Sequence, residues 1–281
     1  MKIICLLLCS LSVFSQSFNS TSSKGHLIVN GGEITPEAIE RFVSLAGGVD
    51  ASYVYVPSAS TSIRLDNGFI YEPLDNGSDS AKNQKAKFEI ELAKLFGVKK
   101  VIVLHTTDRK IADSKEFNKP LVSANGVWLG PGNAGRYAIT FLGTLFTKEL
   151  ENVLMRGGVI GGSSAGAIIQ GSYIVRGRPD KPLLMAKGHE KGFGFLQNVV
   201  INPHLTSAKR DTELVNVLEQ YPTLLGIAID DQISLVFSGD TFEIIGKGIA
   251  AIYDNEQHNG KWWYVLKPGI QFDIKRRAVI K

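Results

Sequence analysis

Short apolar runs alternate with helical patterns through most of this chain, and the alternation limits the folds that it can adopt. The runs are four or five residues long and lie at residues 26–30, 53–56, 101–104 and 126–129. Apolar strands of this length, joined through helices, are typical of a parallel sheet that helices cover on both faces. We therefore predict an α/β fold with a mostly parallel sheet.

The pattern changes near the C-terminus. Residues 249–253 and 262–266 flank Asn259-Gly260, a dipeptide favoured in two-residue hairpin turns. We expect this hairpin to extend the same sheet with antiparallel strands. No linker divides the chain, which predicts one domain at residues 26–281.

The first residues have the pattern of a signal peptide. A basic Met1-Lys2 precedes residues 3–14, which are apolar apart from two serines and two cysteines, and the small Ser15 stands at the expected cleavage point. The apolar run is too short to cross a bilayer as a helix. We predict a signal peptide at residues 1–15, a flexible tail at 16–25, and export to the periplasm or the extracellular space.

Both cysteines of the chain, Cys5 and Cys9, lie in this predicted signal peptide. A lipoprotein site at Cys9 is the less favoured alternative, because the large Leu7 and Leu8 precede it. After cleavage the chain would have no disulfide, no thiolate metal site and no cysteine nucleophile. Covalent catalysis would then need a different nucleophile.

The charge of the chain argues against a nucleic-acid partner. Lys and Arg number 31 against 27 Asp and Glu, a net charge of +4, and the densest basic run is Lys275-Arg276-Arg277. Nucleic-acid-binding domains carry a stronger basic patch. We expect no nucleic-acid partner and no membrane span, and a homodimer stays open.

The strongest local motif is Gly162-x-Ser164-x-Gly166, which directly follows the short apolar run at 159–160 and precedes a helical pattern. This is the context of a nucleophile elbow, a tight strand-to-helix turn that exposes a serine hydroxyl. The next backbone amide, that of Ala165, begins the helix and can stabilise an oxyanion. The alternative is a plain glycine-rich turn.

A serine nucleophile needs a base, and the best-placed of the five histidines is His204. It follows the apolar run at 199–201, so it lies at the end of a predicted strand, where sites of parallel sheets form. His105 also ends a strand and is a weaker alternative. His258 lies in the Asn-Gly turn, where we expect it to be solvated, and it would be the base only in the α/β-hydrolase order Ser, acid, His.

The acid that orients the base is expected at the end of the apolar run 226–229, where Asp230 and Asp231 follow. Neighbouring side chains on a strand point to opposite faces, so only one of the two can reach His204. The residues alone leave this choice open.

A second glycine-rich loop, residues 130–135, formally matches Gly-x-Gly-x-x-Gly. It follows a later strand and no strand-end acid lies about 20 residues on, which argues against a dinucleotide. The loop could instead supply backbone amides to an oxyanion. We find no His/Asp/Glu cluster with metal-ligand spacing, and we expect no metal and no cofactor.

At these residues the chain resembles the cyanophycinase and dipeptidase E family of serine peptidases. The resemblance spans nearly all of the predicted mature chain and rests on five segments in order. They are Val56-Pro57-Ser58-Ala59-Ser60, Pro131-Gly132-Asn133-Ala134, Gly162-Ser163-Ser164-Ala165-Gly166-Ala167, Asn202-Pro203-His204-Leu205 and Ala228-Ile229-Asp230-Asp231. The resemblance implies a flavodoxin-like three-layer sandwich, related to class I glutamine amidotransferases, with serine in place of their cysteine.

The resemblance also implies site roles. Ser164 would be the nucleophile, His204 the base and Asp231 the acid, with the amides of Gly132 and Ala165 at the oxyanion. Asn133, Lys209 and Arg210 would bind substrate, the last two through a negatively charged part of it. The substrate would be a small peptide or a β-aspartyl isopeptide.

The chain departs from the family pattern at several positions. Ala134 stands where the family has Gln, Asp231 where it has Glu, and Asn202-Pro203 where it has Asp-Gln. The family carries several arginines just after the histidine, and in that region this chain keeps only Lys209 and Arg210. The resemblance therefore supports the catalytic core better than it supports specificity for β-aspartyl-arginine. The departures also motivate the alternative of a catalytically silent binding protein.

Overall fold

The computed structural model describes residues 24–281 apart from residues 76 and 182. The predicted signal peptide, with Cys5 and Cys9, and most of the predicted tail lie outside the described residues. Within the described part, no helix combines the length and the apolar character that crossing a membrane requires.

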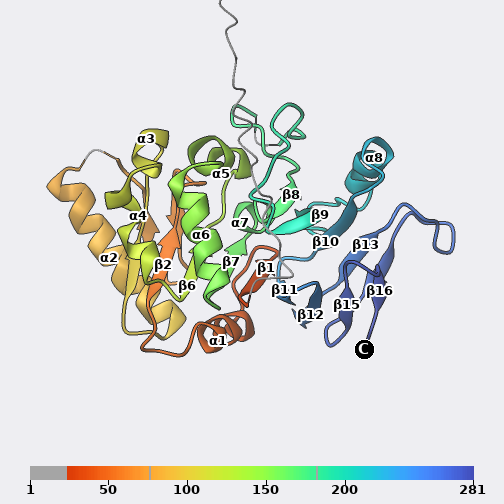
Figure 1. Ribbon diagram of the computed structural model, residues 1–281, viewed down its shortest axis with the longest axis horizontal. Helices are drawn as coiled ribbons and strands as arrows, with labels where there is room; N and C mark the ends of the chain where they lie inside the picture. The colour runs from red at the N-terminus through yellow and green to blue at the C-terminus, as the bar shows by residue number, and fades with distance from the viewer. Residues whose placement is uncertain (1–23, 76, 182) are drawn as a thin grey trace, which may run out of the picture.

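Helices and strands alternate through the first two thirds of the chain, as predicted (Figure 1). The helices are α1 (Pro36–Leu45), α2 (Asp79–Phe96), α3 (Arg109–Ala112), α4 (Lys115–Val122), α5 (Ala134–Phe141), α6 (Leu145–Met155), α7 (Ala165–Ile168) and α8 (Glu213–Gln220). The strands up to the end of α8 are β1 (His26–Asn30), β2 (Tyr53–Val56), β3 (Ile63–Arg64), β4 (Ile70–Tyr71), β5 (Val101–Val103), β6 (Gly126–Leu129), β7 (Val159–Ser163), β8 (Gly171–Tyr173) and β9 (Leu196–Pro203). The remaining strands are β10 (Leu225–Ile229), β11 (Ile233–Ser238), β12 (Thr241–Gly246), β13 (Ala250–Tyr253), β14 (Tyr264–Leu266), β15 (Gln271–Asp273) and β16 (Ala278–Val279).

The main sheet has nine strands in the order β16-β15-β12-β11-β1-β7-β6-β2-β5. The five strands from β1 to β5 in this order are parallel to one another, and the other four continue the sheet antiparallel beyond β1. The parallel strands are the apolar runs of the sequence. Buried on both faces, they need no polar alternation.

The two faces of this sheet pack against different helices. In β2, Tyr53 and Tyr55 join a buried cluster with Phe42 of α1 and Phe88 of α2. Val54 and Val56 point to the opposite face and join a cluster with residues of α5 and α6. The period of two along the strand thus gives the three layers of a flavodoxin-like sandwich, with helices on both sides of the sheet (Figure 1).

The C-terminal hairpin forms as predicted, but in a second sheet. β13 and β14 pair antiparallel around Asn259 and Gly260, which have φ angles of 52° and 79°. They belong to a five-stranded sheet in the order β14-β13-β10-β9-β8, so the prediction of one continuous sheet was wrong. The antiparallel extension of the main sheet is made by β11, β12, β15 and β16 instead.

The chain passes from the second sheet into the main sheet through residues 230–232, between β10 and β11. β8, β9 and β10 are mutually parallel, so their carboxyl ends lie at one edge. One apolar cluster includes Val29 and Ile160 of the main sheet together with Ile201 and Ile227 of the second. The carboxyl ends of β7, β9 and β10, where the predicted site residues lie, are thereby held by one packed core.

Candidate active site

Ser164 stands at the turn between β7 and α7, with φ 51° and ψ −106°. A positive φ is unfavourable for a residue with a Cβ and is often retained at functional sites. The turn is tight: a Cβ on Gly162 would lie 2.3 Å from the Gly166 carbonyl oxygen, and one on Gly166 would lie 2.0 Å from that of Leu129. Both glycines are therefore required by close backbone packing.

His204 directly follows β9 and meets Ser164 across the junction of the two sheets. Its Nε2 lies 2.8 Å from the Ser164 hydroxyl. His204 also has a positive φ, 62°, which turns the chain sharply at the end of the strand. The sequence prediction that these two residues come together is thus matched by their geometry.

Asp231 faces the other ring nitrogen of this histidine. Its Oδ1 is hydrogen-bonded to His204 Nδ1, and its Oδ2 accepts a hydrogen bond of 2.6 Å from the Ser207 hydroxyl. Partial burial raises the pKa of Asp231, but the hydrogen bonds from Ser207 and His204 outweigh it and hold the pKa below its ordinary value. The carboxylate therefore stays ionised beside the imidazole.

Asp230 points away from the imidazole. Its Oδ1 accepts the backbone N–H of Thr206 and its Oδ2 that of Ile249, both at 3.0 Å. The sequence left open whether Asp230 or Asp231 reaches the histidine. In the structure Asp231 contacts His204, and Asp230 holds the loop that follows His204.

Two glycines after β1 make room for this arrangement. A Cβ on Gly32 would lie 2.8 Å from both Asp231 Oδ1 and His204 Cε1, and one on Gly31 would lie 1.9 Å from the Asp230 carbonyl oxygen. The sequence alone assigned no role to Gly31-Gly32. Their adjacency was the available signal, but the chain segment that they face was not visible from the sequence.

The two predicted oxyanion residues lie in different loops: Ala165 begins α7 directly after Ser164, and Gly132 lies in the loop between β6 and α5. Gly132 has φ 134°, and a Cβ there would lie 2.2 Å from the Ala59 carbonyl oxygen. Among the described residues, the backbone N–H groups of Gly132 and Ala165 donate to no acceptor. Asn133 is engaged within the protein: its side chain accepts from Gly135 N at 2.8 Å, capping α5, and donates to the Arg178 carbonyl at 2.9 Å.

Arg210 is half-buried and turned toward the backbone that leads into the base. Its Nη1 donates to the Pro203 carbonyl at 2.7 Å. Burial and the nearby Arg176 lower the pKa of Arg210. Lys209 is exposed, with φ 54°. Substrate binding by Asn133, Lys209 and Arg210 stays a prediction.

Comparison with known proteins places the chain among peptidases. The family model Peptidase family S51 matches residues 26–245. The chain belongs to peptidase family S51. It is a serine-type peptidase, a hydrolase, and similar to cyanophycinases.

Individual relatives of this S51 peptidase agree with the family match. It is 26% identical over 237 residues to the cyanophycinase of Geminocystis herdmanii (strain PCC 6308), covering 82% of this chain and 80% of the relative. It is 25% identical over 269 residues to the cyanophycinase of Trichormus variabilis, covering 87% of this chain and 82% of that relative. The fold resembles that of a peptidase from an acI-B1 actinobacterium, with a TM-score of 0.64 and 20% identity. The match covers 90% of this chain and 98% of that peptidase.

The rival histidines of this S51 peptidase have other partners. His105 Nδ1 lies 3.0 Å from the Ser58 hydroxyl. His258 is held in the β13–β14 hairpin by Asp254, at 2.9 and 3.0 Å from its two oxygens, and is less solvated than predicted. The contact between Ser164 and His204 therefore favours the order Ser, His, acid.

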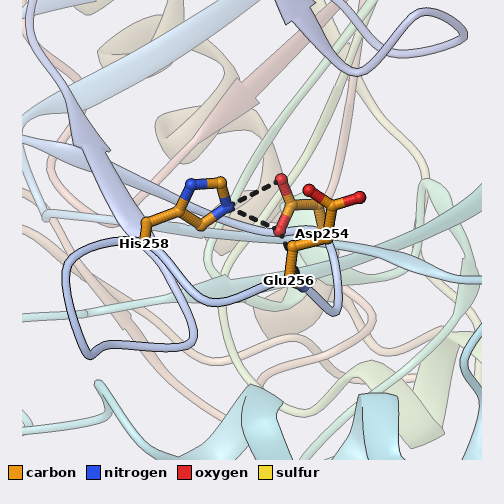
Figure 2. Close-up of side chains that lie close together, drawn as sticks. All are labelled: Asp254, Glu256 and His258. Atoms are coloured by element: carbon orange, nitrogen blue, oxygen red, sulfur yellow. Dashed lines mark hydrogen bonds and ion pairs between the residues drawn. The ribbon is translucent and has the colours of Figure 1, made fainter.

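The expectation that no His/Asp/Glu cluster exists was wrong for one place. Asp254, Glu256 and His258 offer ligand-type atoms that all lie within 4.8 Å of one another (Figure 2). The His258 nitrogen that faces this group is already hydrogen-bonded to Asp254. The contact between His258 and Asp254 is thus accounted for as a hydrogen bond within the segment that joins β13 and β14.

Proposed function

We propose that this S51 peptidase cleaves small peptides or β-aspartyl isopeptides with Ser164, His204 and Asp231 as its catalytic triad. The observation that carries the proposal is the continuous hydrogen-bonded chain from the Ser164 hydroxyl through both nitrogens of His204 to Asp231. A serine, a base in contact with it and an acid that orients the base are the parts of a covalent hydrolase.

In the proposed reaction Ser164 Oγ attacks the carbonyl carbon of the scissile bond while His204 Nε2 takes the hydroxyl proton. The tetrahedral intermediate places its oxyanion toward the amides of Ala165 and Gly132, which lack acceptors within the described protein. His204 then protonates the leaving amine, and an acyl-enzyme on Ser164 remains. Water, deprotonated by His204, attacks this ester and releases the acid product and the free serine.

Asp231 holds the imidazole throughout. It accepts from Nδ1, which fixes the tautomer with a free Nε2 lone pair and stabilises the imidazolium after proton transfer. The shorter Asp in place of the family Glu is compensated by the position of the carboxylate, which reaches His204 directly and needs no bridging water.

The substrate proposal rests on the relatives, which are named cyanophycinases. Departures at Ala134 and Asn202-Pro203 argue for a different peptide or isopeptide from that of those relatives. We further propose export after cleavage of residues 1–15, supported by the basic start and the apolar run. Fractionation of its own cells should find the protein outside the cytoplasm, and N-terminal sequencing of that fraction should give Gln16 as the first residue; protein found only in the cytoplasmic fraction with Met1 intact would contradict export.

A fluorophosphonate probe tests the nucleophile without knowledge of the substrate. Mass spectrometry should place one phosphonyl group on Ser164, and Ser164→Ala should abolish labelling. A screen of dipeptides that includes β-aspartyl and acidic N-terminal members, with Ser164→Ala as the blank, then tests the substrate class. Labelling at a different serine would contradict the proposed triad.

A further inference from the structure

A cavity of about 360 Å³ lies between the end of β8 and helix α8. Tyr173 ends β8 and Arg176 follows it, while Val217 belongs to α8 and Tyr221 comes directly after that helix. The segment after Ser164 and the segment after His204 thus form its two sides. Its volume is within the range of small-molecule sites.

The cavity lies at the edge of the second sheet that carries the base and the acid. β8, β9 and β10 are parallel, so Tyr173, Pro203 and Ile229 end their strands on the same side. In open α/β sheets, ligands bind outside the carboxyl ends of the strands. The location is therefore the one expected for part of a substrate-binding site.

Polar contacts join the cavity wall to the strand that carries the base. Arg176 forms an ion pair with Glu213 at the start of α8. The other oxygen of Glu213 accepts a hydrogen bond of 3.0 Å from Asn202, two residues before His204. The wall is thus fixed relative to the imidazole, as a specificity site requires.

The chemistry of the lining favours an uncharged ligand. The rings of Tyr173 and Tyr221 lie 4.8 Å apart, and Met185 and Val217 add further apolar surface. Burial raises the pKa of the Tyr173 phenol, which stays neutral. The ionisable Arg and Lys side chains of the lining are matched in number by its Glu side chains, and one such pair is already bonded (Arg176, Lys187, Glu190, Glu213).

We propose that this cavity is a specificity subsite for a large uncharged side chain, aromatic or aliphatic, of the peptide substrate. The inference rests on the proposed function, because a subsite presupposes peptide cleavage at Ser164. An apolar wall gains from burial of an apolar side chain, and a lining with balanced charges offers a charged side chain no net opposite charge.

Equilibrium binding to Ser164→Ala tests the subsite independently of turnover. The probes are Ala-Ala, Phe-Ala and Ala-Phe, measured by titration calorimetry. One of the two Phe peptides should bind about ten- to a hundred-fold more tightly than Ala-Ala, the discrimination typical of a hydrophobic pocket. Replacing that Phe with Lys or Glu should return the affinity to the Ala-Ala level.

Two substitutions on α8 locate the effect. Asn216 is an exposed residue on the cavity rim, so Asn216→Trp fills the cavity and should reduce the preference for Phe to less than threefold. Glu219→Trp, on the same helix but outside this lining, is the matched control and should leave the preference intact. If Asn216→Trp does not fold, as judged by thermal melting, Tyr221→Ala removes one aromatic wall and should weaken Phe binding.

Equal affinity for the three peptides, or a Phe preference that survives both Asn216→Trp and Tyr221→Ala, would overturn the subsite. If the wild-type protein hydrolyses peptides but shows no such cavity-dependent preference, the proposed function stands and only the subsite is wrong. A cavity-dependent Phe preference without any hydrolysis would contradict the proposed function and keep the binding site.

Discussion

The hydroxyl of Ser207 lies 2.6 Å from Oδ2 of Asp231, so the carboxylate that touches His204 is held at both of its oxygens. Ser207 comes three residues after His204, and Asp231 comes from the link between the two sheets. One short loop thus supplies both the base, His204, and a hydrogen bond that holds Asp231, the acid that orients this base. This gives Ser207 a positioning role in the proposed triad.

Ser207→Ala should lower kcat about tenfold and leave KM unchanged, because the lost hydrogen bond frees the carboxylate but touches no substrate. Ser207→Thr keeps the hydroxyl and should restore most of kcat. In an Asp231→Asn background, Ser207→Ala should cost nothing further. Steady-state rates of the four variants measure this; a fall in kcat that Thr does not rescue would assign Ser207 to loop structure alone.

Gly32→Ala should inactivate the enzyme while the chain still folds. The added methyl would meet Asp231 and His204 at 2.8 Å, so the imidazole and the carboxylate must separate. We expect a loss of at least about a hundred-fold in kcat/KM, since catalytic groups tolerate little displacement. Activity and the thermal midpoint should be measured together. Full activity in Gly32→Ala would show that the pair accommodates the methyl.

Asp231 should contribute to stability in a pH-dependent way. Its folded-state pKa is depressed, so its stabilising contribution is present above the unfolded pKa of about 3.9 and is lost as the pH falls through the lower folded pKa. The difference in unfolding free energy between wild type and Asp231→Asn should therefore shrink between about pH 5 and about pH 2.5. Urea titrations at both pH values measure it; a difference that grows on acidification would contradict the depressed pKa.

Arg210 tests whether the chain binds an acidic part of its substrate. Arg210→Ala should raise KM for an aspartate-containing dipeptide about tenfold and leave a neutral dipeptide unchanged, since a guanidinium matches a carboxylate. The alternative follows from its hydrogen bond to the Pro203 carbonyl, one residue before His204. Equal losses of kcat on both dipeptides would show that Arg210 supports the base loop.

The local parts of the site were predictable because they depend on short sequence signals. The glycines around Ser164 indicate a tight turn. His204 and Asp231 each lie close after an apolar run, and these runs end at or within two residues of the ends of β9 and β10. A strand that stops at a polar side chain directs that side chain to the sheet edge. Such signals need only neighbouring residues.

The parts that failed depend on contacts between distant segments. The hairpin at Asn259-Gly260 was recognisable, but its sheet was not, because β13 pairs with β10 rather than with the main sheet. Gly32 and Ser207 gain their roles only from the position of Asp231, which is about 200 and 24 residues away in sequence. Pairing partners of this kind cannot be inferred from one chain's periodicity.

The central claim is that Ser164 and His204 act as one unit, and a double-mutant comparison of kcat/KM tests it most directly. The substrate is the best dipeptide of the screen, with wild type, Ser164→Ala, His204→Ala and the double variant measured side by side. The 2.8 Å contact between Oγ and Nε2 predicts that the three variants lose activity to a similar extent, because members of a triad are not additive. Independent losses that multiply in the double variant would contradict the account.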